Sequence, residues 1–309
     1  MSSINNNPWI DSGVDVTGLM STSEALAQSN LDWEVRKQPV FVDYDGGKKK
    51  VDNHYANVRQ TDGKTLGIFS KNYTVLQNRD AFTFFDNIFE KGDAFIERAG
   101  SFGKNNAKVW IQAKLPNYMR IGNTDDIIQK YVLLVNSHDG STPIALKVIP
   151  HRLLCQNQLN ATLKNKSDLI KVRHTKNLEI NMYEAQKALG LVHRAYDEIE
   201  QVFNEMARVK LLTNDMNAYY NAVMNNGKKE VATRTKNNIL DVKKVFEEGA
   251  GVDDPTLRGS LFHVYNAVTE YVDHHKSYNK NTDRLHATTF GSGERLKKKA
   301  YAEALKLVV

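Results

Sequence analysis

The residue types that most often carry catalysis are few and scattered in this sequence. His138 and Asp139 are adjacent, and Asp273, His274 and His275 form a second group much later in the chain. A His-Asp pair ligates metal in several phosphohydrolases, where a second His/Asp cluster follows at helical spacing. Here the second group is consecutive, so its members point to different sides of a helix. A turn and a helix end explain these histidines better than a metal centre does.

Two further motifs supply neither a nucleophile nor a phosphate loop. Cys155 is the only cysteine and lies in a leucine-rich stretch, as is typical of a buried, inert thiol. Residues 290–293 read Phe-Gly-Ser-Gly without the Gly-Lys-Ser/Thr of a phosphate-binding loop, so they predict a turn. We therefore expect a non-enzymatic protein without cofactor or metal. A metal-dependent nuclease that uses the scattered His and Asp residues is the weakest alternative.

Basic residues cluster after the middle of the chain. Between residues 163 and 176 their only acidic neighbour is Asp168. With two residues upstream, the candidate phosphate contacts are Lys147, Arg152, Lys164, Lys166, Lys171, Arg173 and Lys176. Lys and Arg displace the counterions condensed on nucleic acid, which is the main source of non-specific affinity. A solvated helix or loop explains the same charges equally well, and Arg152 is also placed to brace the turn after Pro150.

A second candidate surface combines aromatic and basic residues. Lys104 follows Phe102, and Lys108 precedes Trp110. Stacking of a base on an exposed ring contributes about 1–3 kcal/mol. Rings in alternating strands more often join the core. Because Trp110 alternates with apolar neighbours, the sequence does not decide which face it occupies.

The chain is organised around a predicted two-stranded hairpin. Residues 131–135 are an apolar run, residues 136–140 contain an Asp-Gly turn signal, and residues 144–149 form the return strand between two prolines. Residues 151–160 then show the apolar spacing of a helix start. This arrangement suits a binding surface.

The first half predicts further strands. Residues 33–42 form an edge strand because of Pro39, with Val35 and Val42 facing inward, and hairpin turns follow at residues 44–47 and 61–64. Strand-like pieces at residues 66–69 and 73–76 precede a helix over residues 79–91 that Asn78 caps. A strand pair over residues 94–102 and 107–115 ends at Pro116.

The second half predicts helices. Amphipathic spacing covers residues 181–212 and 256–274, and a basic helix covers residues 294–309. We therefore predict an α+β protein with a twisted antiparallel sheet and packed helices in its N-terminal half and a mostly helical C-terminal half. The expected divisions are a flexible arm (residues 1–22), a β-rich core (23–160) and a helical region (161–309). Trp9 and Ile10 in the arm predict docking onto the body or onto a neighbouring subunit. Together with the edge strand at residues 33–42, which needs cover, they predict a homo-oligomer.

Several segments in this order resemble a known family. They are LGIFSKNY at residues 66–73, QNR at 77–79, RLLCQN at 152–157, NAVTEYVDH at 266–274, and FGSG at 290–293 ahead of the terminal helix. The order resembles the phage/plasmid-like protein family, an uncharacterised domain of phages, plasmids and integrated elements, over roughly residues 30–305. The resemblance implies a mobile-element protein of unsettled activity. The first half is also similar in its pattern to single-strand annealing proteins, a fold-level analogy.

Composition narrows the function classes. Hydrophobic residues make up 41% and charged residues 25% of the 309 residues, as in globular proteins. No apolar run approaches the roughly 20 residues needed to cross a bilayer, and no signal peptide begins the chain, so we expect a protein of the host cytoplasm without membrane contact. The net charge of +6 permits nucleic-acid binding. We predict a single-stranded nucleic-acid-binding protein, of annealing type, in recombination or replication, working as a ring or filament. The alternative is a phage factor that binds and modulates a host defence or replication protein.

Overall fold

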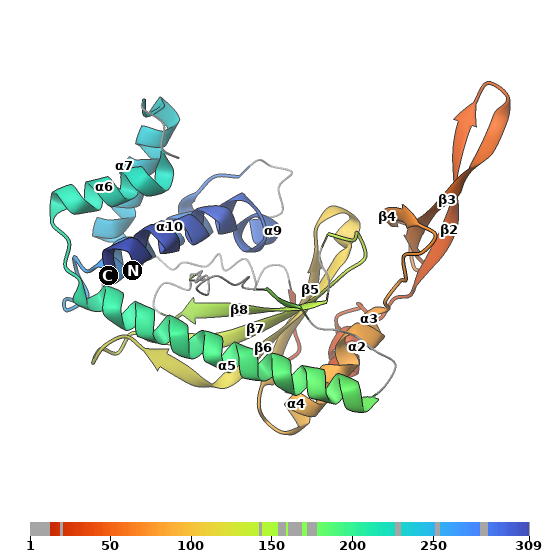
Figure 1. Ribbon diagram of the computed structural model, residues 1–309, viewed down its shortest axis with the longest axis horizontal. Helices are drawn as coiled ribbons and strands as arrows, with labels where there is room; N and C mark the ends of the chain where they lie inside the picture. Colours follow the sequence, from red (N-terminus) through yellow and green to blue (C-terminus); the bar gives the residue numbers. More distant parts are fainter. Residues whose placement is uncertain are drawn as a thin grey trace.

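The computed structural model describes residues 13–18, 21–141, 144–153, 159, 169–171, 178–225, 230–250, 254–278 and 284–308. Antiparallel sheets dominate the N-terminal half and helices the C-terminal half, which confirms the predicted α+β class (Figure 1). Within these ranges, no helix combines the length and the apolar character that a membrane span requires.

The larger sheet has six strands in the order β1-β5-β6-β7-β8-β9. They are β1 (Gly13–Asp15), β5 (Phe95–Phe102), β6 (Lys108–Arg120), β7 (Ile127–Ser137), β8 (Ala145–Arg152) and β9 (Leu169–Lys171). The predicted central hairpin is confirmed as β7 and β8, which pair from Ile128 with Arg152 to Val135 with Ala145. The predicted helix start at residues 151–160 is wrong at its beginning, because His151 and Arg152 still belong to β8. Its remainder falls largely outside the described residues.

Two other boundaries differ from the prediction. Residues 13–15, assigned to the flexible arm, form strand β1 on the edge of β5. Pro116 does not end its strand, since β6 continues to Arg120. The pairing of β6 with β7 skips from Lys114 to Tyr118, so Pro116 lies in an irregularity where no ladder hydrogen bond is required of it. Trp9 and Ile10 lie outside the described residues.

Helices α2 (Thr22–Gln28), α3 (Asn78–Phe82) and α4 (Asp86–Glu90) pack at one end of the sheet (Figure 1). Ser21 and Glu24 form a capping box at the start of α2. The single helix predicted over residues 79–91 is wrong. A 3-10 turn at Thr83–Phe85 divides it, and Asn78 does not cap it. The amide of Asn78 instead donates to the carbonyl of Leu31, 2.8 Å away.

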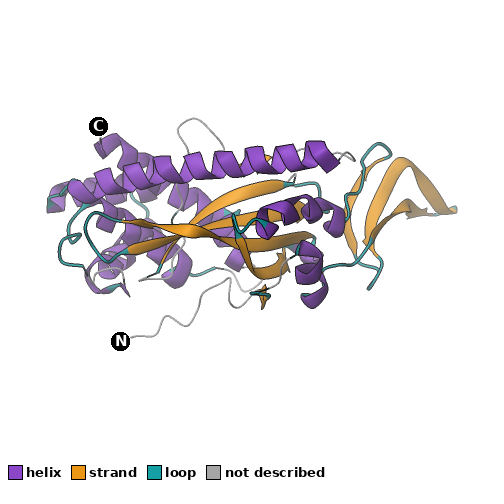
Figure 2. Cartoon of the chain, turned by 90° about the horizontal axis from the view of Figure 1, so that it is seen from below, coloured by secondary structure: helices purple, strands orange, loops and turns teal. Residues whose placement is uncertain are grey.

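Helix α5 (Leu178–Arg208) runs along one face of the sheet (Figure 2). Apolar side chains from its inner face, such as Val192 and Ile199, join the main hydrophobic cluster with sheet residues such as Val132. The hydroxyl of Tyr196 donates to the carbonyl of Tyr131 and accepts from the Tyr131 amide at 2.8 Å. This pair of bonds fixes the helix to the central strand.

The remaining helices form the other end of the molecule. They are α6 (Thr213–Met224), α7 (Thr233–Glu248), α8 (Leu261–Glu270), the π-helical turn η4 (Tyr271–His275), α9 (Arg284–Thr289) and α10 (Ser292–Val308). Side chains of α6, α7, α8 and α10 join the same hydrophobic cluster as the sheet. One core therefore contains residues from both sides of the predicted boundary at residue 160.

A separate three-stranded sheet projects from the body (Figure 1). We call this sheet, β2 (Val35–Tyr44), β3 (Gly47–Arg59) and β4 (Thr65–Ser70), the ribbon. Its order β2-β3-β4 confirms the two predicted hairpin turns and makes the Pro39 strand an edge. The prediction that Val42 faces inward is wrong, because the outer part of β2 has no body beneath it and Val42 is exposed. Residues 73–76 form no strand.

Candidate nucleic-acid interface

The structure contradicts four of the predicted nucleic-acid contacts, because the side chains of these residues are buried: Lys108, Trp110, Lys147 and Arg152. A phosphate group cannot reach a side chain that solvent does not reach. Each of the three cations has a carboxylate partner within the protein, as buried charges require.

The partners of these cations come from distant parts of the chain. The ammonium of Lys147 forms an ion pair with Glu294 of α10 and donates to the carbonyl of Thr289 at 2.5 Å. The Arg152 guanidinium donates through Nε to both carboxylate oxygens of Asp126, at 2.9 and 2.7 Å. These side chains hold the sheet and the helices together.

Trp110 occupies the sheet face opposite α5. It packs in a small cluster with Phe102 and Leu133 of the sheet, covered by Leu285 of α9 and by Phe290. The face that the sequence left undecided is therefore a core face. Trp110 contributes to packing and is not available to stack on a base.

Of the other six predicted contacts, the structure describes two, Lys104 and Lys171. Lys104 is exposed, in the short turn Lys104–Asn106 between β5 and β6. Lys171 belongs to β9 and pairs through its backbone with Ala145. The structure does not bear on the remaining four, since they lie outside the described residues: Lys164, Lys166, Arg173 and Lys176.

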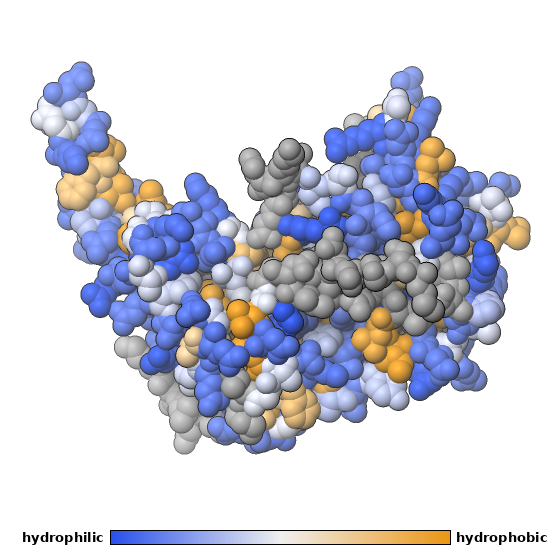
Figure 3. Space-filling model, turned by 180° about the vertical axis from the view of Figure 1, so that it is seen from behind, coloured by the Kyte–Doolittle hydropathy of each residue, from blue (hydrophilic) through white to orange (hydrophobic). Residues whose placement is uncertain are grey.

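The ribbon exposes the combination of side chains that was predicted elsewhere. Its Phe41, Tyr44 and Ile68 are each more than half exposed, at 54%, 58% and 57%. Residues 35–71 also hold eight Lys and Arg against four Asp, a surplus of four out of the net +6 of the whole chain. Apolar surface and polar surface alternate along this projection (Figure 3).

Strand register places lysines beside the exposed apolar groups. Phe41 pairs with Lys50, and Val42 pairs with Lys49. Nearer the body, the Lys50 ammonium lies 5.9 Å from the centroid of the Tyr55 ring, and the Lys37 ammonium lies 5.6 Å from it. Cations in such positions are attracted to the ring faces. Rings and ammonium groups thus lie close together along the ribbon.

The base of the ribbon is fixed to the body by buried polar contacts. Arg59 lies over the ring of Trp33, 4.9 Å from its centroid, and donates to the carbonyl of Asn105 at 2.6 Å. The Asn57 amide donates to the carbonyl of His138 at 3.2 Å. These contacts join β3 to the end of β7, so the ribbon has a defined direction at its root.

His138 itself is uncharged. Burial lowers its pKa to about 4, and the nearby Arg59 acts in the same direction, although Asp139 opposes both. Its Nε2 lies 2.8 Å from Oδ1 of Asn78 and 3.4 Å from the side-chain nitrogen of Asn136. The sequence favoured a turn over a metal centre for His138, and the structure places its ring beside these two buried amides.

Asp139 is an anion held by several donors. Burial alone would raise its pKa, but hydrogen bonds from Ser137 and Ser141 and the ammonium of Lys108 lower the pKa to about 2. The Ser141 hydroxyl lies 2.6 Å and the Lys108 ammonium 3.3 Å from the carboxylate. Asp139 thus braces the turn after β7 and joins it to the start of β6 through Lys108.

A basic groove lies where the ribbon meets the body. It has a volume of 410 Å³, and its lining includes Arg36, Lys37, Lys71 and Tyr73. Tyr73 stacks on Phe69 with ring centroids 4.0 Å apart. The groove continues the basic and aromatic character of the ribbon towards the body.

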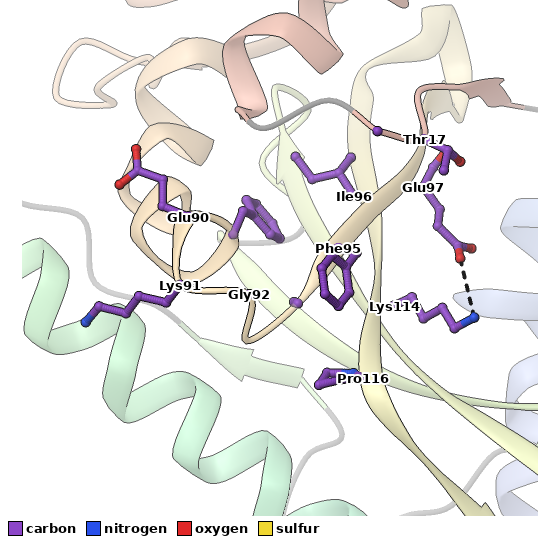
Figure 4. A pocket seen from close by; sticks show the side chains of 12 residues that line it. Thr17, Glu90, Lys91, Gly92, Phe95, Ile96, Glu97, Lys114 and Pro116 are labelled. Atoms are coloured by element: carbon purple, nitrogen blue, oxygen red, sulfur yellow. Dashed lines mark hydrogen bonds and ion pairs between the residues drawn. The ribbon is translucent and has the colours of Figure 1, made fainter.

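A larger pocket of 730 Å³ lies at the edge of the six-stranded sheet (Figure 4). Phe89, Phe95 and Pro116 give it an apolar wall, and Lys114 faces Glu97 across an ion pair of 4.0 Å. Glu90, Lys91 and Thr17 add polar groups to this apolar lining, as in small-molecule binding pockets.

The second His/Asp group, residues 273–275, is also engaged in contacts within the protein. Asp273 accepts from the buried Lys297 ammonium at 2.8 Å, and His275 lies 3.8 Å from Glu270. In the part of the chain that the structure describes, no three His, Cys, Asp or Glu side chains are placed to hold a metal ion.

The ribbon residues were not among the predicted contacts. Two signals in the sequence point to them: three consecutive lysines, residues 48–50, and a Phe-Val-Asp-Tyr segment, residues 41–44, on the other side of a Gly-Gly turn. The apolar residues of this segment suggested a core strand, and the lysines suggested an ordinary return strand. Only their joint exposure makes them a candidate site.

Comparison with known proteins gives one match. The family model described as a domain of unknown function (DUF932) matches residues 65–290. Neither the curated proteins nor the solved structures include a match to this chain. The matched segment begins with β4, so β2 and β3 precede it.

Proposed function

This chain belongs to the DUF932 family, a domain of unknown function, and we propose that it binds single-stranded nucleic acid through the ribbon β2–β3–β4. The observation that carries the proposal is the joint exposure of rings and lysines on this projecting sheet. The groove at its root, lined by Lys37 and Lys71, extends the surface.

The physical argument rests on what a single strand offers. Its phosphates attract lysines without regard to sequence. Its unpaired bases present faces that stack on aromatic rings, with about 1–3 kcal/mol per base. A duplex offers the phosphates but hides the base faces within its stack. Phe41 and Tyr44 beside Lys48, Lys49 and Lys50 therefore favour a single strand.

The finer parts of the proposal are a mobile-element origin and an annealing role in recombination or replication in the host cytoplasm. The resemblance of residues 66–73 and 290–293 to phage and plasmid proteins supports the origin. The uncovered edges of β2 and β4 support assembly into a homo-oligomer, because open sheet edges are sites of strand pairing. The proposed role uses no cofactor and no catalysis.

The test compares two triple variants of equal charge change. One replaces Lys48, Lys49 and Lys50 by Ala, and the control replaces three exposed lysines of the helical end, Lys236, Lys244 and Lys306. Affinity for a single-stranded oligonucleotide is measured by fluorescence anisotropy at several salt concentrations. Removal of each lysine that contacts a phosphate should flatten the plot of log affinity against log salt by roughly 0.7.

We expect the ribbon variant to lose affinity for every sequence, with a flatter salt plot, while the control retains the wild-type slope. A third variant, with Lys164, Lys166, Lys171 and Arg173 replaced by Ala, tests the contacts that lie in the other basic cluster. If the ribbon variant binds like the wild type, the ribbon is not the interface. If the wild type binds no single strand, the nucleic-acid function is refuted.

The alternative, a factor that binds and modulates a host defence or replication protein, is favoured by one specific observation. Val42 and Ile68 are exposed aliphatic side chains, which do not stack on bases as rings do. Together with an open strand edge they suit a protein partner that adds a strand. Retention of partner binding by a variant that carries Val42→Ser and Ile68→Ser would argue against this alternative.

A further inference from the structure

The outer part of the ribbon is only two strands wide. Strand β4 pairs with residues 54–58 of β3 and leaves the remainder of β3 without a third strand. We call residues 40–51 the outer hairpin. Every residue from 41 to 50 is exposed, so the body covers neither face. Such a hairpin is one backbone layer thick, with strands about 4.8 Å apart.

Both faces of the outer hairpin carry the same chemistry. Paired residues share a face, and successive residues alternate between faces. On one face Phe41 pairs with Lys50, and Lys48 lies two residues from Lys50 on the same strand, opposite Asp43. On the other face Val42 pairs with Lys49, next to Tyr44. Each face thus presents one aromatic ring together with lysine.

The end of the hairpin is narrow. Tyr44 pairs with Gly47, which has a φ of +113° that favours glycine. At Gly46 a Cβ atom would lie 2.6 Å from the Tyr44 ring, so the ring lies over a backbone without side chains. The tip is therefore aromatic on one side and slim enough to enter between two chains.

A surface for a single strand needs one face, whereas this hairpin offers two faces that each carry a ring and lysine, on a fixed root. Pairing of the outer edge of β3 with the same edge of a second copy would bring the lysine triplets of both copies together, which like-charge repulsion disfavours. Lysines on both faces instead complement the phosphates of two strands that pass on either side. Apolar side chains inserted at a base step are a known way to unstack it.

We propose that the outer hairpin is a wedge for forked nucleic acid, a duplex that opens into two single-stranded arms. Its tip enters at the junction, Phe41 and Tyr44 stack on the bases that lose their partners, and the lysines of each face contact one arm. This inference rests on the proposed single-strand binding and specifies its substrate. It makes no covalent change to the nucleic acid.

The experiment uses the full chain with three DNA probes of equal length: a fork with two non-complementary arms, a single strand and a blunt duplex. We expect the fork to bind about tenfold more tightly than the single strand, which corresponds to ~1.4 kcal/mol, within the stacking energy of one base. A 2-aminopurine base at the junction should brighten on binding as it unstacks.

The variant Phe41→Ala/Tyr44→Ala removes both rings, and Tyr183→Ala, an exposed ring on α5 outside the ribbon, is the control. We expect the double variant to bind fork and single strand equally and to leave 2-aminopurine dim. Tyr183→Ala should keep the fork preference. All three side chains are exposed, so circular dichroism and thermal unfolding should be unchanged.

The faces are tested separately by a photo-crosslinking phenylalanine derivative at position 41 or at position 44. We expect the two positions to crosslink to opposite arms of the fork. Crosslinks to the same arm, or equal wild-type affinity for fork and single strand, would overturn the wedge while the single-strand function stands. Absence of binding to any probe would overturn both proposals.

Discussion

Arg152 was predicted to contact phosphate, and its surroundings now predict a large structural effect instead. Arg152 is 1% and Asp126 0% exposed, and Arg152 Nη2 also lies 2.5 Å from a carboxylate oxygen. The guanidinium carbon lies 5.5 Å from the ring centroid of Phe262. In Arg152→Ala the Asp126 carboxylate would remain buried without its partner.

The expected cost follows from that isolated charge. Removal of one partner of a buried ion pair typically lowers the free energy of unfolding by about 3–5 kcal/mol. This is a large part of the ~5–15 kcal/mol by which domains are stable. Removal of both charges, in Asp126→Leu/Arg152→Met, should cost much less, because no unpaired carboxylate remains. We expect the double variant to be more stable than Arg152→Ala by at least ~2 kcal/mol.

Urea unfolding followed by circular dichroism measures these differences. A neighbouring pair supplies the control: Arg120 lies 3.0 Å from Asp125, but the Arg120 side chain is 43% exposed. Arg120→Ala should therefore cost less than about 1 kcal/mol. The reasoning fails if Arg152→Ala is as mild as this control. It also fails if the double variant is as unstable as Arg152→Ala, since packing rather than charge would then set the loss.

Three further outcomes concern the root of the ribbon and the buried histidines. Burial lowers the pKa values of His138 and His263 to about 4, so the folded protein keeps its full stability above pH ~6.5 and loses stability as the pH falls towards 4. Unfolding measured at several pH values should show that the free energy of unfolding falls by roughly 3 kcal/mol per histidine over this range. His138→Gln should remove about half of this pH-dependent loss. Asp139→Asn should lower the free energy of unfolding by about 1–3 kcal/mol, because Asp139 has a pKa of about 2 and accepts from several donors; a change below ~0.5 kcal/mol would contradict this. Gly140→Ala should lower the melting temperature, because Gly140 has a φ of +71° and a Cβ there would lie 2.5 Å from the Phe69 ring.

Local signals in the sequence were sufficient for the hairpin turns and for the strands that flank them. The Asp-Gly turn at residues 139–140 lies between β7 and β8, and the turns near residues 45 and 62 lie between the ribbon strands. Such turns depend on the conformational preferences of two or three residues, so no distant contact is needed to specify them. Amphipathic spacing likewise identified α5, because its inner face packs on a continuous core.

Burial of charge could not be predicted in the same way. Lys147 and Glu294 are separated by 147 positions, and Arg152 and Asp126 by 26. A single sequence shows that a lysine is present but not that a carboxylate from another element neutralises it. The two residues were therefore assigned to the surface, where most lysines and arginines lie.

The ribbon was missed for a related reason. An apolar segment such as residues 40–42 normally indicates a face that packs on a core, which led to the inward assignment of Val42. That inference assumes that the strand belongs to a sheet with a body beneath it. The outer hairpin leaves the body, so neither of its faces is an inside face.

The distribution of charge connects these results. In the body, Lys108, Lys147 and Arg152 are neutralised by carboxylates, so their positive charge produces little field at the surface. Within residues 35–71, Lys and Arg outnumber Asp by four, and Lys48, Lys49 and Lys50 lie on an exposed strand. Charge on a thin projection surrounded by water is accessible to a ligand from several directions and is screened only by salt, over about 8–10 Å at physiological ionic strength. An anionic polymer should therefore be attracted first to the ribbon. The proposed function thus depends on how the affinity of the lysine variants changes with salt, rather than on their affinity at one salt concentration.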